Sequence, residues 1–149
     1  MNKKKILPPT IFWISLVLSI GLHFILPIKK FIVAPYNYTG ILLICGGILL
    51  NLWADRLFKN KHTTVKPFEK SSCLIEEGPF AFSRNPMYLG MTMVLLGISI
   101  TLGSVISFII TVVFPFFISF SFILPEERSL DETFGQDFVE YKKRVRRWL

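Results

Sequence analysis

Charge is scarce over most of this chain. Only 18% of its 149 residues are Asp, Glu, Lys or Arg, and residues 6–28, 31–54 and 85–125 contain none of these. Hydrophobic residues make up 52% and aromatic residues 15%. A sequence with so little charge cannot cover a folded domain with solvated side chains, which excludes an ordinary water-soluble protein and indicates an integral membrane protein.

Cysteine and histidine are also rare, with two residues of each type. Cys45 lies in an apolar run and Cys73 in a polar connection, so we expect no disulfide between them. Neither cysteine has a histidine at a ligand spacing, so we expect no metal site. No glycine-rich phosphate loop or nucleophile elbow is present either, which argues against several common classes of soluble enzyme.

The uncharged runs predict the fold class. A helix needs about 20 apolar residues to cross a bilayer, so each of the first two runs is long enough for one crossing. The run at 85–125 would form roughly 60 Å of helix, about two bilayer thicknesses, and we expect it to fold back at Leu102-Gly103-Ser104. The sequence therefore predicts a single all-α domain over 1–149, an integral membrane bundle of about four transmembrane helices near residues 7–28, 36–57, 86–102 and 105–124, with cytosolic C-terminal amphipathic helices.

Positive charge predicts how these spans are oriented. With four spans and the N-terminus in the cytosol, 15 of the 17 Lys and Arg residues lie on the cytosolic side, which the positive-inside rule favours. Both termini, a loop at 59–84 and a cap at 125–149 are then cytosolic. The net charge of +7 reflects this topology and attraction to anionic lipids, so we expect no nucleic-acid partner.

The N-terminal stretch Lys3-Lys4-Lys5 before an apolar run resembles a signal peptide, but we expect the run to be retained as the first span.

The C-terminal cap shows helical periodicity. Large apolar residues recur at steps of four, three, four and three, which lines them on one face of a predicted amphipathic helix: Phe134, Phe138, Tyr141, Val145 and Trp148. Basic residues occupy most of the other side. Two interpretations remain open, a basic helix that anchors the cap to the membrane surface and a lid over a cofactor.

Polar residues flank the folded apolar run. Asn85 before Pro86 is a typical helix start, and Pro125 before two carboxylates is a typical first helical turn. A hairpin, however, returns both edges of the run to one membrane face, where neighbouring helices pack about 8 to 10 Å apart. Five residues would then line one niche suited to a small zwitterion that carries hydroxyl groups: Arg84, Asn85, Tyr88, Glu126 and Glu127.

Two stretches carry a family resemblance, "LIEEGPFAFSRNPMYLG" and "PEERSLDETFGQDFVEYKKRV". They resemble the integral-membrane methyltransferases that include isoprenylcysteine carboxyl methyltransferase and the phospholipid N-methyltransferases. That family's pattern is Arg-His-Pro-x-Tyr-x-Gly, then a Glu-Glu pair, then Phe-Gly-x-x-Tyr-x-x-Tyr. The resemblance covers roughly Lys59 to Trp148; Asn85 stands where His is usual and Phe138 where Tyr is usual.

The resemblance implies S-adenosylmethionine as the methyl donor, bound at the cytosolic side. It implies the following cofactor-binding residues: Leu74, Ile75, Gly78, Asn85, Pro86, Tyr88, Glu126 and Glu127. Arg84 and Glu127 would be the catalytic residues. Arg84 would hold the methionine carboxylate or an acceptor carboxylate, and Glu127 would help remove a proton from an acceptor amine.

The methyl acceptor and the oligomeric state are left open by the sequence. A prenylcysteine-like carboxylate, a phospholipid amine and an unrelated small lipophile all fit as acceptors. Two other functions stay open: an NADPH-dependent reductase related to the sterol reductases, and a non-catalytic lipid-binding membrane adaptor. We interpret His62-Thr63-Thr64 as a solvated loop outside the site.

Overall fold

The computed structural model describes residues 7–26, 30–61 and 73–149, and these residues contain helices and no strand. The helices are α1 (Pro8–Ile25), α2 (Thr39–Asn60), α3 (Pro86–Leu102), α4 (Val105–Ile118), α5 (Leu124–Phe134) and α6 (Gln136–Arg144). Short 3₁₀ turns, η1 (Tyr36–Tyr38) and η2 (Gly78–Ala81), precede α2 and α3. Lys3-Lys4-Lys5, His62-Thr63-Thr64 and the middle of the 59–84 loop lie outside the described residues.

Three of these helical segments are long and apolar enough to cross a membrane: Pro8–Ile25, Tyr36–Asn60 and Val105–Phe134. The fourth, α3, is apolar but has 17 residues. Large apolar side chains point outward from the bundle, among them Phe24 at 73% exposure and Leu42 at 75%. An outward apolar surface of this kind suits lipid and not water, so the all-α membrane class is confirmed.

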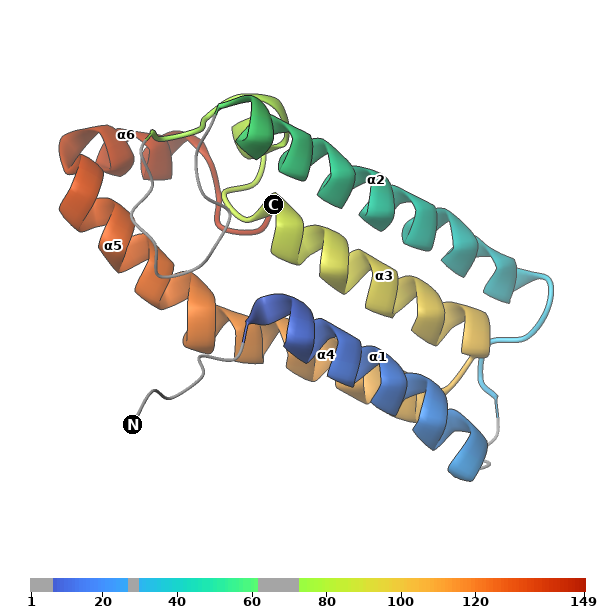
Figure 1. Cartoon of the computed structure of the whole chain (residues 1–149). Coiled ribbons are helices and arrows are strands. Elements are labelled where there is room, and N and C mark those ends of the chain that lie inside the picture. Colours follow the sequence, from blue (N-terminus) through green and yellow to red (C-terminus); the bar gives the residue numbers. More distant parts are fainter. Residues whose placement is uncertain (1–6, 27–29, 62–72) are drawn as a thin grey trace.

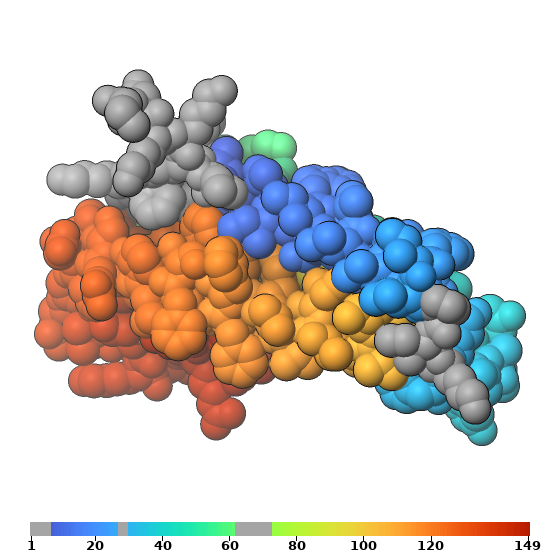
Figure 2. Space-filling view, turned by 90° about the horizontal axis from the view of Figure 1, so that it is seen from below, coloured from blue at the N-terminus to red at the C-terminus, as the bar shows by residue number. Residues whose placement is uncertain are grey.

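The helices lie side by side in the order α2, α3, α4 and α1 (Figure 1). Seen from below, α1 lies along α4 (Figure 2). The first residues of α1 and α3 lie at the same end of the bundle as the last residues of α2 and α4, and α5 and α6 extend beyond that end (Figure 1).

Glycines let α2 and α3 approach closely. A Cβ on Gly97 would lie 2.5 Å from the Gly40 carbonyl oxygen, and a Cβ on Gly47 would lie 2.5 Å from that of Gly90. Small residues at such contacts are typical of helix pairs in membranes, because packing and not water exclusion holds the pair together. This close pairing holds α3 against the first half of α2.

The turn expected at Leu102-Gly103-Ser104 is present. Gly103 ends α3 in the left-handed conformation, with φ 63°, and α4 begins at Val105. A Cβ at Gly103 would also lie 2.2 Å from the Ile32 carbonyl oxygen, so glycine is required there for two reasons. The turn sends α4 back along α3 and brings the two polar edges of the run to the same end of the bundle.

Pro125, Glu126 and Glu127 lie in the first turn of α5, as expected, but α5 is continuous with the preceding helix. The helix continues from α4 through a π-helical turn, η3 (Ser119–Ile123), into α5. Proline has no N–H and its ring collides with the carbonyl four residues earlier in a regular helix. A wider turn just before Pro125 relieves that collision: the Leu124 N–H bonds to the Ser119 oxygen, five residues back.

The apolar periodicity predicted one helix through Phe134, Phe138, Tyr141, Val145 and Trp148, and this prediction was wrong. The cap is two helices, α5 and α6, that meet at Gly135, whose φ of 53° breaks the helix. The apolar face still turns inward, because Phe138, Tyr141 and Val145 are buried in one cluster with Leu74 and Leu130. This face of α6 packs on protein, so α6 caps the bundle and does not present that face to lipid.

Candidate functional site

The polar edges of the hairpin meet where α3 begins and α5 begins. Arg84 and Asn85 immediately precede α3, Tyr88 lies in its first turn, and Glu126 and Glu127 lie in the first turn of α5. Since α3 and α4 run in opposite directions around the Gly103 turn, these residues share one end of the bundle (Figure 1).

Glu127 is held between two arginines. Arg84 Nη2 lies 3.1 Å from Glu127 Oε1, and Arg147 donates from Nε to Oε1 at 3.1 Å and from Nη2 to Oε2 at 2.6 Å. The side chains of Arg84 and Glu127 are 11% and 12% exposed, whereas that of Arg147 is 39% exposed. The hydrogen bond to Glu127 raises the pKa of Arg147. Two guanidinium groups around one carboxylate keep a largely buried charge paired.

Glu126 has a different partner. The Tyr88 hydroxyl donates to Glu126 Oε1 at 2.8 Å, and the Tyr88 ring is buried in the cluster between α3 and α4. The two adjacent glutamates therefore bind different side chains, one through a hydroxyl and the other through guanidinium groups.

Asn85 does not cap α3 with its side chain. Its Nδ2 donates to the Arg147 carbonyl oxygen at 3.0 Å, and no side-chain cap is made, although Pro86 is the first helical residue as expected. The side chain is thus used to hold the C-terminal segment, and the helix start relies on Pro86.

The segment Val145–Trp148, which follows α6, completes this end of the bundle. The Arg84 N–H donates to the Arg146 carbonyl oxygen at 3.0 Å, next to the Asn85 bond to Arg147. Trp148 packs against the α3 and α4 cluster that contains Tyr88. The segment therefore lies directly against the residues before α3.

A buried hydrogen bond ties α6 to the same region. The Tyr141 hydroxyl donates to the Phe80 carbonyl oxygen in η2 at 2.7 Å. Burial raises the pKa of Tyr141, so the hydroxyl keeps its proton and remains a donor at neutral pH. This bond joins the C-terminal cap to the loop that precedes α3.

Leu74, Ile75 and Gly78 lie in apolar surroundings beside the polar niche. Leu74 packs against the α6 cluster, and Ile75 is buried with Ala54 and Phe80. Gly78 has a φ of 60°, and a Cβ there would lie 3.3 Å from Leu57. The described hydrogen bonds and ion pairs of the niche connect the five polar residues and Arg147, and they do not include these three.

Sequence reasoning missed Arg147. It belongs to a basic run that the sequence assigns as a whole to the basic side of one amphipathic helix, and no spacing separates it from Arg146 or Arg144. The only available signal was its place between Val145 and Trp148, two residues of the apolar set.

An apolar groove lies at the opposite end of α4 from the polar niche. It offers no polar group for chemistry and is lined by Phe31, Val105, Phe108, Ile109, Val112 and Val113.

Comparison with known proteins identifies the family. Residues 36–137 match the family described as phospholipid methyltransferase. The chain belongs to this family. The match includes both edges of the hairpin and ends before the Val145–Trp148 segment.

Membership in the phospholipid methyltransferase family makes this chain a membrane methyltransferase by class, in agreement with its long apolar helices. It is also similar to an uncharacterized protein of Haemophilus influenzae, with 35% identity over 63 residues, which is 42% of this chain and all of that protein. No solved structure matches the chain.

Proposed function

We propose that the protein transfers a methyl group from S-adenosylmethionine to a lipophilic acceptor at the cytosolic face of the membrane. The observation that carries the proposal is the contact between Arg84 and Glu127, which closes a polar niche at one end of an apolar bundle. Ionic groups held next to lipid are functional candidates, since their burial is costly.

The hydrogen-bonding capacity of the niche fits the amino-acid part of this donor. An ionised carboxylate has about four acceptor positions: Arg147 hydrogen-bonds to both oxygens of Glu127, and Arg84 Nη2 also lies 3.1 Å from Oε1, which leaves an acceptor position open at Oε2. Arg84 Nε is buried and has no hydrogen-bond partner among the described residues. One spare acceptor and one spare cationic donor match an α-ammonium and an α-carboxylate.

The remaining residues would hold the rest of the donor. Glu126 and Asn85 have the acceptor and donor groups that ribose hydroxyls need, and Tyr88 fixes Glu126. Pro86, Leu74, Ile75 and Gly78 would supply backbone and apolar contacts. These assignments rest on the chemistry of the side chains and on the family resemblance.

The donor supplies an already activated methyl group on a sulfonium, so the protein needs no metal and no nucleophilic residue for this step. The residues of this chain would align the acceptor and keep water out. As alternatives to these contacts with the donor, Arg84 would hold a carboxylate acceptor by paired hydrogen bonds, and Glu127 would take the proton that methylation releases from an amine acceptor.

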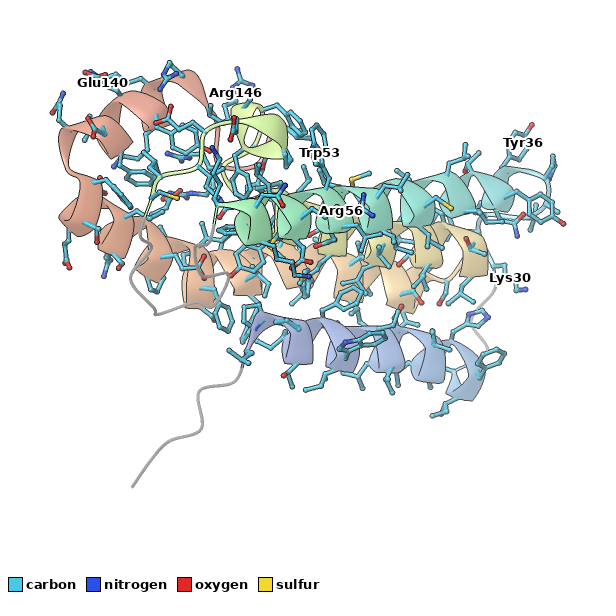
Figure 3. All side chains as sticks on the ribbon, turned by 45° about the horizontal axis from the view of Figure 1, so that its top comes forward. Lys30, Tyr36, Trp53, Arg56, Glu140 and Arg146 are labelled. Atoms are coloured by element: carbon cyan, nitrogen blue, oxygen red, sulfur yellow. The ribbon has the colours of Figure 1, made fainter. Side chains whose placement is uncertain are left out.

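Four crossings with both termini in the cytosol complete the proposal. α1, α2, α3 and the α4 part of the long helix would each cross once, and the charge distribution favours the cytosolic orientation of the polar niche. Lys30 and Arg146 lie at opposite ends of the molecule, as this topology requires (Figure 3).

The acceptor would enter sideways from the bilayer, between α3 and α4, while the donor enters from the cytosol. Met91 packs against the cluster between these helices, so Met91→Trp should slow methylation of a long-chain acceptor and leave donor affinity unchanged. If Met91→Trp lowered the methylation rate and the donor affinity by the same factor, this route would be refuted.

Calorimetric titration with S-adenosylhomocysteine, the product of the donor, tests the function. The wild-type protein should bind it, Glu127→Gln should bind at least about tenfold more weakly, and the exposed control Glu132→Gln should bind normally. Binding of NADPH in its place would favour the reductase, and binding of neither would favour the lipid-binding adaptor.

A further inference from the structure

We propose that Arg147 is a positioning residue of the donor site: its guanidinium orients the Glu127 carboxylate so that one acceptor position of Oε2 faces the donor. The inference rests on the proposed function and adds a residue that lies beyond the family match at 36–137.

The geometry at Glu127 singles out Arg147. Its Nε and Nη2 hydrogen-bond to both oxygens of the carboxylate, whereas the contact described for Arg84 is an ion pair at Oε1. A single contact allows a carboxylate to rotate about its last bond, and a paired contact from a planar guanidinium fixes its plane. Arg147 therefore decides which way Oε2 points, through its hydrogen bond to that oxygen.

The backbone around Arg147 is itself held firmly. Two consecutive carbonyls, those of Arg146 and Arg147, accept hydrogen bonds from the Arg84 N–H and the Asn85 side chain, both at 3.0 Å. Val145 on one side is buried with α6, and Trp148 on the other packs against the α3 and α4 cluster. A side chain is precise only when its own support is fixed, and this segment has support on both sides.

The neighbouring basic residues have other surroundings. Lys142 pairs with Asp131, and Arg144 pairs with Glu76. Arg146 is exposed and lies on the outer surface of the cap (Figure 3). Arg146 has the same charge and the adjacent position, so it provides a matched control.

The test measures S-adenosylhomocysteine affinity by calorimetry on the full chain in detergent or lipid discs. Arg147→Ala and Arg147→Lys should each bind about tenfold to a hundredfold more weakly, the range expected for loss of one or two charge-assisted hydrogen bonds. Arg147→Lys should bind weakly because lysine keeps the positive charge but lacks the planar guanidinium that hydrogen-bonds to both carboxylate oxygens. Arg146→Ala and Arg146→Lys should bind as the wild type does.

A second readout separates positioning from general support of the fold. Free guanidinium ions, added below the concentration that unfolds the protein, should restore part of the affinity of Arg147→Ala, and equal sodium chloride should not. Melting temperatures measured on the same samples show whether each variant is folded. If Arg147→Ala unfolds, the affinity of Arg147→Lys decides the outcome, because lysine keeps the charge and most of the side chain.

The outcomes are distinct. Wild-type protein that binds no S-adenosylhomocysteine refutes the proposed function and this role with it. Wild-type binding that both Arg147 variants retain within twofold refutes the positioning role alone. A folded Arg147→Ala variant whose lost affinity guanidinium leaves unchanged also refutes it.

Discussion

Arg84 Nη2 lies 3.1 Å from Glu127 Oε1, although the two residues border opposite ends of the uncharged run at 85–125. The contact exists because Gly103 reverses the chain between α3 and α4. It places two largely buried charges at the edge of a bundle whose outer surface is apolar. Breaking this contact should therefore affect the fold as well as the site.

Glu127→Ala should destabilise the protein by about 3 kcal/mol, because it leaves the buried Arg84 guanidinium without its carboxylate. Thermal or denaturant unfolding in detergent measures the loss. Glu132→Ala, in the same helix but exposed, should change stability by less than about 0.5 kcal/mol. Equal stabilities of the two variants would show that the Glu127 cluster adds nothing to the fold.

Asn85 should tolerate histidine better than alanine. The Asn85 amide donates to the Arg147 carbonyl, and a histidine ring N–H is able to donate to the same oxygen. Asn85→Ala should lower unfolding free energy by about 1 kcal/mol and weaken S-adenosylhomocysteine binding, and Asn85→His should recover most of both losses. An Asn85→His protein no better than Asn85→Ala in either measurement would contradict this use of the side chain.

Gly97→Ala should disrupt the contact between α2 and α3. Its Cβ would lie 2.5 Å from the Gly40 carbonyl oxygen and 2.9 Å from the Ile44 nitrogen, and backbone atoms cannot move aside as a flexible side chain does. We expect a loss of about 1–3 kcal/mol in unfolding free energy. Gly21→Ala in α1 is the control, since nothing lies within 4 Å of its Cβ, and it should be neutral or slightly stabilising.

The proposed topology predicts which end of the bundle is reachable from outside the cell. In a background with Cys45→Ala and Cys73→Ala, a cysteine replacing Lys30 should react with a membrane-impermeant maleimide in intact cells. A cysteine replacing Arg146 should react only after the membrane is opened. The opposite labelling pattern would show that the protein has the reverse orientation in the membrane. Reaction of both introduced cysteines in intact cells would contradict an arrangement with Lys30 and Arg146 on opposite sides.

Features visible in the sequence predicted the class of fold and the meeting of Arg84 with Glu127. The length of the uncharged run required a reversal, and Gly103 was the residue able to provide it. Once the run folds back, Asn85, Tyr88 and Glu126 necessarily come to the same end. The hydrogen bonds and ion pairs among these residues follow from that reversal, and their roles in binding the donor remain predictions.

Other features left no comparable signal. The helical periodicity of Phe134, Phe138 and Tyr141 runs through Gly135 without interruption, so periodicity alone concealed the break between α5 and α6. The attachment of the C-terminal segment depends on the carbonyl oxygens of Arg146 and Arg147. Because every residue has such an oxygen, no sequence pattern could show which ones would be used.

The central claim is methyl transfer to a lipophilic acceptor, and the most direct measurement uses purified protein, donor labelled in its methyl group and a total lipid extract of the host cell. The account predicts that label enters the lipid fraction with the wild-type protein and with Glu132→Gln, and that Glu127→Gln loses most of this incorporation. Absence of label from every lipid with folded wild-type protein, or full incorporation with Glu127→Gln, would contradict the account.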